Sequence, residues 1–298
     1  MRMIKKNFIQ YLRTEKNYSS HTEISYISDL TQLEDYIIET LGEFDPVRVD
    51  KDLIRGWVIQ MTEDGIKPRS INRKLSAIKT FYRYLQKTGT IEVNPVEGIT
   101  GPKAPKNLPT YISHKEIKGL LNSETIFTDD FEGVRDRFII EILYATGMRR
   151  AELAALRNSD IDFHTNNIKV TGKRNKERII PISKETAQSL NRYIESRNEN
   201  IKNISPYLLV NKSGEGLKPS AIYNIVNKYL ENIPTISKRS PHVLRHSFAT
   251  EMLNSGADIS AVKEIMGHNS LSSTEIYTHV TFKELQKTYN NAHPRAKK

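Results

Sequence analysis

Residues 98–109 read GITGPKAPKNLP, a stretch with three prolines and two glycines among twelve residues. Proline lacks a backbone N–H and glycine is conformationally free, so neither a helix nor a strand is stable there. We expect this stretch to be a linker between an N-terminal domain, residues 1–97, and a C-terminal domain, residues 110–298. The length of 298 residues also favours two domains.

The part before the linker is predicted to be helical. Between Ser19 and Ile38, apolar residues recur at steps of three and four, and Ser20 is a candidate N-cap. A second such pattern covers Lys67–Lys87, which holds seven basic residues and no acidic one. A charged run is usually a solvated helix face, but unbalanced positive charge also suits contacts to phosphate. The candidate DNA-binding residues are Lys67, Arg69, Arg73, Lys74 and Lys79.

The composition limits the possible partners. The 45 basic and 35 acidic residues give a net charge of +10, which favours a polyanionic partner. The first 107 residues hold 17 basic and 14 acidic side chains, so both domains are basic. The absence of cysteine excludes disulfides, thiolate zinc sites and cysteine nucleophiles. With no signal peptide and no apolar run near about 18 residues, we expect a soluble cytoplasmic protein without membrane insertion.

The part after the linker is predicted to mix helices with a small β-hairpin. Residues 168–170 and 178–182 alternate as strands around the turn 171–176. Ser240 and Asp258 are candidate N-caps of helices that Gly256 and Gly267 end. The other expected helices cover residues 114–122, 134–146, 149–157, 184–198, 219–230 and a segment from 272 or 273 through 277. The predicted fold class is mainly α, of the α+β kind.

Two short motifs carry groups suited to binding an anion. In ATGMRRAEL, residues 145–153, Arg149 and Glu152 stand three apart, so we expect them on one helix face, with the carboxylate orienting the guanidinium. In PHVLRH, residues 241–246, His242 and Arg245 have the same spacing near a helix N-terminus, which favours an anion. A surface ion pair and a packed histidine are the plain alternatives, and a metal site here would lack an acidic or cysteine ligand nearby.

A third motif holds a candidate nucleophile. His268 is followed nine residues later by Tyr277, in GHNSLSSTEIYTHV. A tyrosine on an amphipathic helix is usually a core residue. Here, however, the chain also offers two arginines, two histidines and Lys173 at the hairpin tip, and these groups suffice to attack a phosphodiester without a metal.

These motifs, in this order, resemble the tyrosine recombinase (phage integrase) family and, within it, the Xer recombinases, over the whole chain. The chain's ending resembles the XerC branch more than the XerD branch. The resemblance implies a helical N-terminal core-binding domain that clamps DNA and a C-terminal catalytic domain with an exchange tail. Its implied catalytic residues are Arg149, Lys173, His242, Arg245, His268 and the nucleophile Tyr277, supported by Glu152, and Arg174 joins the DNA-binding residues.

The resemblance also implies a mechanism and partners. Tyr277 would form a 3′-phosphotyrosyl link that keeps the phosphodiester energy, so neither ATP, another cofactor nor a metal is required. The partners would be double-stranded DNA at a recombination site, a homo- or hetero-tetramer of recombinases on two sites, and an FtsK-type DNA translocase. The biological role would be chromosome dimer resolution, and thus chromosome partition in the cell cycle.

Three alternatives stay open. A DNA-binding protein without catalysis would use the same basic helices but leaves the spacing of Tyr277 unexplained. A monomeric topoisomerase of the tyrosine class would relax supercoils without pairing two sites. An integrase of a phage or transposable element shares all the catalytic residues and differs mainly in biology.

Overall fold

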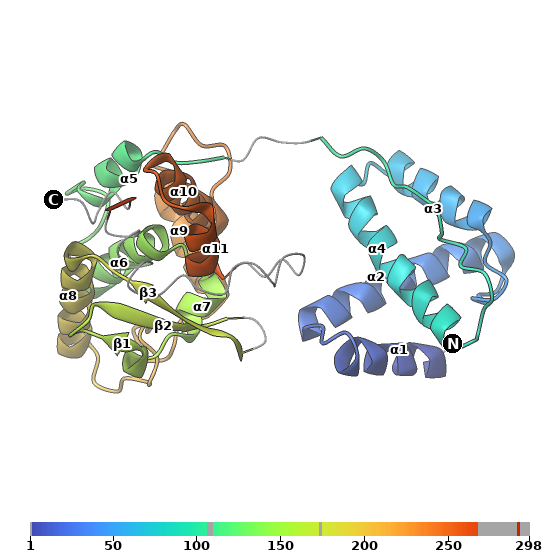
Figure 1. Ribbon diagram of the computed structural model, residues 1–298, viewed down its shortest axis with the longest axis horizontal. Coiled ribbons are helices and arrows are strands. Elements are labelled where there is room, and N and C mark those ends of the chain that lie inside the picture. Colours follow the sequence, from blue (N-terminus) through green and yellow to red (C-terminus); the bar gives the residue numbers. More distant parts are fainter. Residues whose placement is uncertain (1, 106–109, 173–174, 268–290, 293–298) are drawn as a thin grey trace. The chain divides into compact units, whose positions relative to one another are not determined.

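The computed structural model describes residues 2–105, 110–172, 175–267 and 291–292 (Figure 1). The chain divides into two compact units, Met1–Asn107 and Leu108–Lys298, and this boundary falls inside the predicted linker. The fold class predicted from the sequence, mainly α with a small β-sheet, is confirmed. None of the described helices combines the length and the apolar character needed to cross a membrane.

The first unit is made of helices. Ser19 caps α2 through its side chain, which accepts from the N–H of Thr22, so the predicted N-cap at Ser20 is one residue too late. The helix predicted from Lys67 forms, with Lys67 at the N-cap position and Pro68 in the first turn, where its missing N–H costs nothing. The four helices are α1 (Arg2–Thr14), α2 (Ser20–Leu41), α3 (Lys51–Glu63) and α4 (Pro68–Lys87).

Helix α4 supplies one side of the core of this unit. Its apolar residues recur at helical spacing and are buried where α4 packs on α1, α2 and α3. The chain after α4 stays on this core, because Ile99 is buried in it and its carbonyl accepts from Lys79 Nζ at 2.7 Å. Asn72 similarly donates to the carbonyl of Pro102 at 3.0 Å. The first residues of the predicted linker therefore pack as part of the first unit.

The second unit combines helices with a three-stranded antiparallel sheet. The predicted hairpin forms, with Ile168 paired to Ile180. A short third strand, β1, was not predicted. The elements are α5 (His114–Leu121), α6 (Phe131–Thr146), α7 (Arg150–Ala155), the 3-10 turn η1 (Asn158–Asp160), β1 (Ile161–Asp162), β2 (Asn167–Thr171), β3 (Glu177–Pro181), α8 (Lys184–Asn200), α9 (Pro219–Leu230), α10 (Pro241–Asn254) and α11 (Ile259–Met266).

Helix α6 is the centre of this unit. Nearly every residue from Arg135 onward in this helix is buried, because α5, α8, α9 and α10 pack around it. Gly147 ends α6 in the left-handed conformation, at φ +59, and donates its N–H to the carbonyl of Leu143. The turn brings the chain out of the core directly before Arg149.

Helix α11 begins after Asp258 and ends at Gly267, as predicted, and the side chain of Asp258 accepts from the N–H groups of Ser260 and Ala261. Ser240 stands at the N-cap position of α10, but its side chain makes no capping hydrogen bond. Helix α11 packs on both α10 and β3. Its C-terminal end is thereby held between the hairpin and the helix that carries Arg245.

Replacing Gly147 with alanine should destabilise the second unit. The residue has φ +59, and an added Cβ would meet the ring of Phe248. Left-handed strain and overpacking together should cost on the order of 3 kcal/mol. Gly119→Ala is the matched control, because Gly119 lies inside α5 with no heavy atom near the position of a Cβ, so it should gain about 0.5–1 kcal/mol. Differential scanning calorimetry of the full chain measures both, and equal melting temperatures for the two variants would contradict the argument.

Candidate active site

The C-terminal end of α11 is bound by three arginines from three different elements. The last carbonyls of a helix have no partner within it, and the helix dipole favours cations there. The carbonyls of Ile265, Met266 and Gly267 accept, in that order, from Arg178 Nε at 2.7 Å, Arg245 Nη2 at 2.6 Å and Arg149 Nη2 at 3.2 Å. Residues more than a hundred positions apart in the sequence thus meet directly before residue 268.

Glu152 holds two of these arginines. Its Oε1 accepts from Arg149 Nη1 at 2.8 Å, and its Oε2 accepts from the backbone N–H of Arg149 at 2.8 Å. Arg178 adds two bonds, from Nη1 to Oε1 at 3.1 Å and from Nη2 to Oε2 at 2.7 Å. The prediction that Arg149 and Glu152 share a helix face is wrong, because Arg149 has extended backbone at the N-cap of α7. The pair is joined by a capping contact, which orients Arg149 through both its backbone and its side chain.

The carboxylate is kept ionised in a buried position. Burial by itself raises the pKa of Glu152, but hydrogen bonds from Arg178 and from the backbone and side chain of Arg149 outweigh it. The net pKa lies below the ordinary value. Glu152 is therefore negatively charged at neutral pH and can neutralise one of the cations around it.

Arg245 is buried, at 6% exposure, as deeply as Glu152. Besides Met266, it donates to the carbonyl of Gly147. Burial, followed by the nearby charge of Arg149, lowers the pKa of Arg245 to about 10, so it remains a cation at neutral pH. A buried cation next to another cation is unfavourable, and a bound anion would relieve that cost.

His242 lies in the first turn of α10, at the surface and three residues before Arg245. Partial burial of the ring lowers the pKa of His242, and the charges of Arg150 and Arg245 lower it further. Its imidazole is therefore neutral at neutral pH and has both a donor and an acceptor nitrogen. The same cations that keep it neutral make its surroundings electropositive.

Arg178 is a site residue that the sequence reasoning missed. A signal for it exists in the strand, because Arg178 shares a face of β3 with buried Ile180, whereas Glu177 and Ile179 are exposed. A charged residue at a core-facing strand position needs a partner. That partner, Glu152, lies 26 positions away, so no local pattern identified it.

Four predicted site residues lie outside the described residues, and their placement stays a prediction. They are Lys173, Arg174, His268 and Tyr277. The described residues next to them, Gly172 and Gly267, both lie close to the guanidinium of Arg178.

The basic residues of α4 have different surroundings from one another. Lys67 and Arg69 are exposed. Arg73 and Lys74 instead pair with Asp29 of α2, whose side chain is 2% exposed, and Lys74 is itself buried. Part of the charge run that suggested phosphate contacts therefore neutralises a buried carboxylate inside the first unit.

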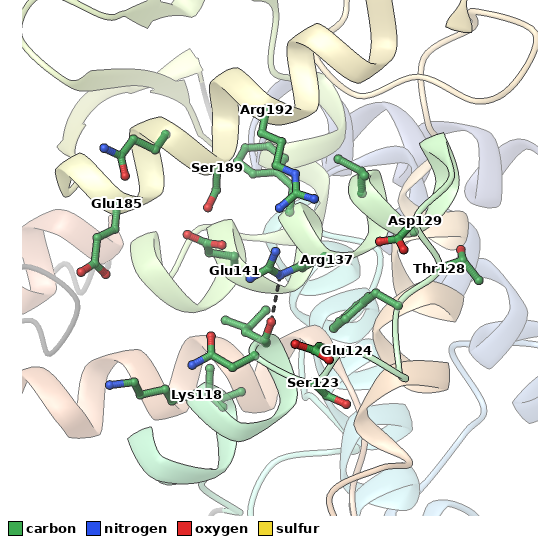
Figure 2. Close-up of a pocket in the computed structure, with 18 of the residues that line it drawn as sticks. Lys118, Ser123, Glu124, Thr128, Asp129, Arg137, Glu141, Glu185, Ser189 and Arg192 are labelled. Atoms are coloured by element: carbon green, nitrogen blue, oxygen red, sulfur yellow. Dashed lines mark hydrogen bonds between the residues drawn. The ribbon is translucent and has the colours of Figure 1, made fainter.

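A cavity of about 940 Å³ lies elsewhere in the second unit, between α5, α6 and α8 (Figure 2). Lys118 of α5, Arg137 and Glu141 of α6, and Glu185 and Arg192 of α8 line it. Arg137 donates across it to the carbonyl of Leu121. None of the described catalytic candidates lines this cavity, so it is separate from the arginine cluster.

Two family descriptions match the chain. Residues 110–284 match the Phage integrase family, and residues 6–89 match the Phage integrase, N-terminal SAM-like domain. The first match contains every predicted catalytic residue, and the second contains the basic helix α4.

Related proteins match along the whole chain. Tyrosine recombinase XerC of Pelotomaculum thermopropionicum is 40% identical over 98% of this chain and 98% of its own length. Tyrosine recombinase XerC of Staphylococcus aureus is 36% identical over 100% of this chain and 99% of its own length.

Solved structures share the fold. The XerH site-specific recombinase bound to palindromic difH substrate has a TM-score of 0.71 at 22% identity, covering 96% of this chain and 94% of that one. The Tn1549 transposon integrase in complex with transposon right end DNA has a TM-score of 0.74 at 20% identity, covering 95% and 97%. From the matched family and the full-length relatives, this chain belongs to the phage integrase family and is a site-specific tyrosine recombinase of the Xer type.

Proposed function

We propose that the arginine cluster at the end of α11 binds the scissile phosphate of a recombination site and that Tyr277 attacks it. The observation that supports this most is the charge balance of the cluster. Three guanidinium groups, those of Arg149, Arg178 and Arg245, share one carboxylate, Glu152, among the contacts of the described residues. The excess positive charge, beside neutral His242, suits an anion that becomes more negative in the transition state.

The donors needed for such an anion are present. A guanidinium has five N–H groups, and the described hydrogen bonds of Arg149 and of Arg245 each use only two of them. We assign to Arg149, Arg245 and His242 the non-bridging oxygens of the phosphate. Positive charge fixed in advance stabilises the pentavalent transition state without reorganisation, which is the role that a metal takes in other nucleases.

The roles of the remaining residues follow from the family resemblance. Lys173 protonates the departing 5′ oxygen, and Tyr277 forms the 3′-phosphotyrosyl link. His268 hydrogen-bonds the phosphate and assists proton movement at Tyr277. The location of Gly267 supports this assignment, because its carbonyl is bound to Arg149 and the chain continues from it into the motif of His268 and Tyr277.

In the cell, we propose Xer-type chromosome dimer resolution in the cytoplasm, supporting chromosome partition at cell division. Relatives named XerC at 36 to 40% identity favour this role over that of a mobile-element integrase, whose solved representative shares only the fold. Two recombination sites would be held by a tetramer, of this chain alone or with a second recombinase, and an FtsK-type translocase would activate it. Recombination between two copies of the host's dimer-resolution site tests this role, and relaxation of supercoils without exchange would favour a topoisomerase.

Helix α4 is proposed to contact the DNA backbone through the cations that are not engaged inside the first unit. Lys67 and Arg69 meet this condition. About half of the Arg73 side chain is exposed while it pairs with Asp29, so it can contact a phosphate only while its guanidinium also binds Asp29. Lys79 donates to the backbone carbonyl of Ile99 and is therefore already engaged. Arg174, in the turn predicted for the hairpin, is a further proposed contact.

Tyr277→Phe should bind the recombination site normally and form no covalent adduct. The substitution removes only the phenolic oxygen, which is the attacking atom. A denaturing gel with a nicked suicide substrate measures the adduct. Tyr289→Phe is the control, because this nearby tyrosine lacks the nine-residue spacing from His268 and should trap DNA as the wild type does. An adduct that persists in Tyr277→Phe rules out the assignment.

Lys173→Ala should be slow on ordinary DNA and recover on a substrate with sulfur in place of the 5′ bridging oxygen. A thiol has a much lower pKa than an alcohol, so a thiolate departs without a proton donor. Arg149→Ala and Arg245→Ala should stay slow on both substrates, since they act on the non-bridging oxygens. Single-turnover cleavage rates give the comparison. Equal impairment of Lys173→Ala on both substrates would mean that it only binds the backbone.

Arg69→Ala should weaken DNA binding and reduce the slope of log affinity against log salt by roughly one unit, as expected for one lost phosphate contact. Lys74→Ala should leave the salt slope unchanged and instead destabilise the first unit, because it removes a cation from buried Asp29. Fluorescence anisotropy over a salt series measures the slope, and thermal unfolding measures stability. A larger change of slope for Lys74→Ala than for Arg69→Ala would reverse this division of roles.

A further inference from the structure

We propose that Arg178 is a positioning residue of the recombination reaction: it holds Glu152 against Arg149 and fixes the end of α11, from which the chain continues to Tyr277. This inference rests on the proposed function of the arginine cluster. Arg178 itself would touch neither DNA nor the reacting atoms.

The geometry of Arg178 supports this role. Its side chain is only 10% exposed, and its planar group makes two bonds to Glu152 and one to the carbonyl of Ile265. Glycines leave the space for it on two sides. A Cβ on Gly172 would lie 3.3 Å from Glu152 Oε1 and 3.5 Å from Arg178 Nη1, and one on Gly267 would lie 3.2 Å from that same Nη1. The guanidinium is thus enclosed between the hairpin and the end of α11.

The contacts require the shape of arginine. A guanidinium bonds both oxygens of a carboxylate with two parallel N–H groups and still donates from Nε in another direction. Arg178 uses this set, with Nη1 and Nη2 on Glu152 and Nε on Ile265. A lysine would offer one ammonium on a flexible stem and could not hold both partners in fixed positions.

Arg178 also favours the ionised form of Glu152. The charged groups that face this carboxylate in the described structure are Arg149 at the start of α7, Arg178 on β3 and Arg245 on α10. Burial raises the pKa of Glu152, and the hydrogen bond from Arg178 is the largest of the effects that lower it. Without Arg178 the pKa of Glu152 rises, so its carboxylate becomes protonated as the pH falls. A neutral Glu152 holds Arg149 more weakly, and cleavage should then decrease toward acidic pH.

The test measures single-turnover cleavage of a nicked suicide substrate from about pH 5.5 to about pH 8.5, above the ordinary pKa of glutamate. The variants are Arg178→Gln and Arg178→Lys. Arg197→Gln is the matched control, because Arg197 is another largely buried arginine of the same unit, at 5% exposure. It donates to the carbonyl of Leu208 at 2.9 Å and to Asn158 at 2.8 Å, with no contact to Glu152. DNA binding and thermal unfolding are measured in parallel.

For Arg178→Gln, the rate relative to wild type should be lower at about pH 5.5 than at about pH 8 by at least roughly twofold, the loss expected once half of the Glu152 side chains are protonated at the lower pH. Arg178→Lys should shift in the same direction by less, and it provides the result if the glutamine variant does not fold. Titration of His242 occurs in every variant and cancels in the ratio. DNA affinity should change little, and Arg197→Gln should lose stability while keeping the wild-type pH profile.

A second change identifies the group that titrates. In Arg178→Gln combined with Glu152→Gln, no carboxyl remains, so the added pH dependence should disappear while the rate stays low. A wild-type pH profile in whichever Arg178 variant folds would overturn the inference, as would pH dependence that persists in the double variant. If the wild-type protein itself forms no adduct through Tyr277, the proposed function has failed instead, so the two failures are distinct.

Discussion

The contact between the Glu152 carboxylate and two guanidinium groups is the interaction on which the candidate site depends. It joins the start of α7, through Arg149, to β3, through Arg178. The same two arginines continue to the carbonyls of Gly267 and Ile265 at the end of α11. One buried carboxylate therefore aligns three elements that are distant in the sequence, and cations at the end of a helix stabilise them together.

The charge balance of this cluster is unfavourable for stability but suits the binding of an anion. Arg245 is buried near Arg149, and burial together with that repulsion lowers its pKa to about 10. A protein built only for stability would pair each buried cation with its own carboxylate or replace it with an apolar residue. The cluster keeps an excess of positive charge, and binding of a phosphate would offset the energy that this excess costs.

The first unit uses part of its positive charge internally. The run of basic residues on α4 has no acidic residue within it, yet Arg73 and Lys74 lie against Asp29 of α2. A charge count along one segment cannot detect this, because the partner is 44 or 45 positions away. Lys67 and Arg69, which are exposed, keep the charge that a DNA backbone would attract.

Local sequence patterns were sufficient to predict most of the secondary structure. Helical spacing, Asp258 and Gly267 defined α11, and alternation defined the hairpin of β2 and β3, because caps, turns and periodicity act between neighbours in the chain. Predictions that needed the exact start of a helix were less accurate. Ser19 rather than Ser20 caps α2, since either serine satisfies the capping pattern. Arg149 precedes α7 rather than lying on its face, since a local pattern locates the start of a helix only to within one or two residues.

The sequence by itself determined the family and the mainly helical fold, and it supplied the candidates for the catalytic residues, because these depend on residue types in a fixed order. Only the tertiary structure decided which of the described candidates lie together. It showed that Arg149, Glu152 and Arg245 meet at the end of α11, and it added Arg178 to them. The reason is that a hydrogen bond or an ion pair depends on distance in space, and the packing of the second unit brings together site residues, Arg149 and Gly267, that the chain separates by 118 positions.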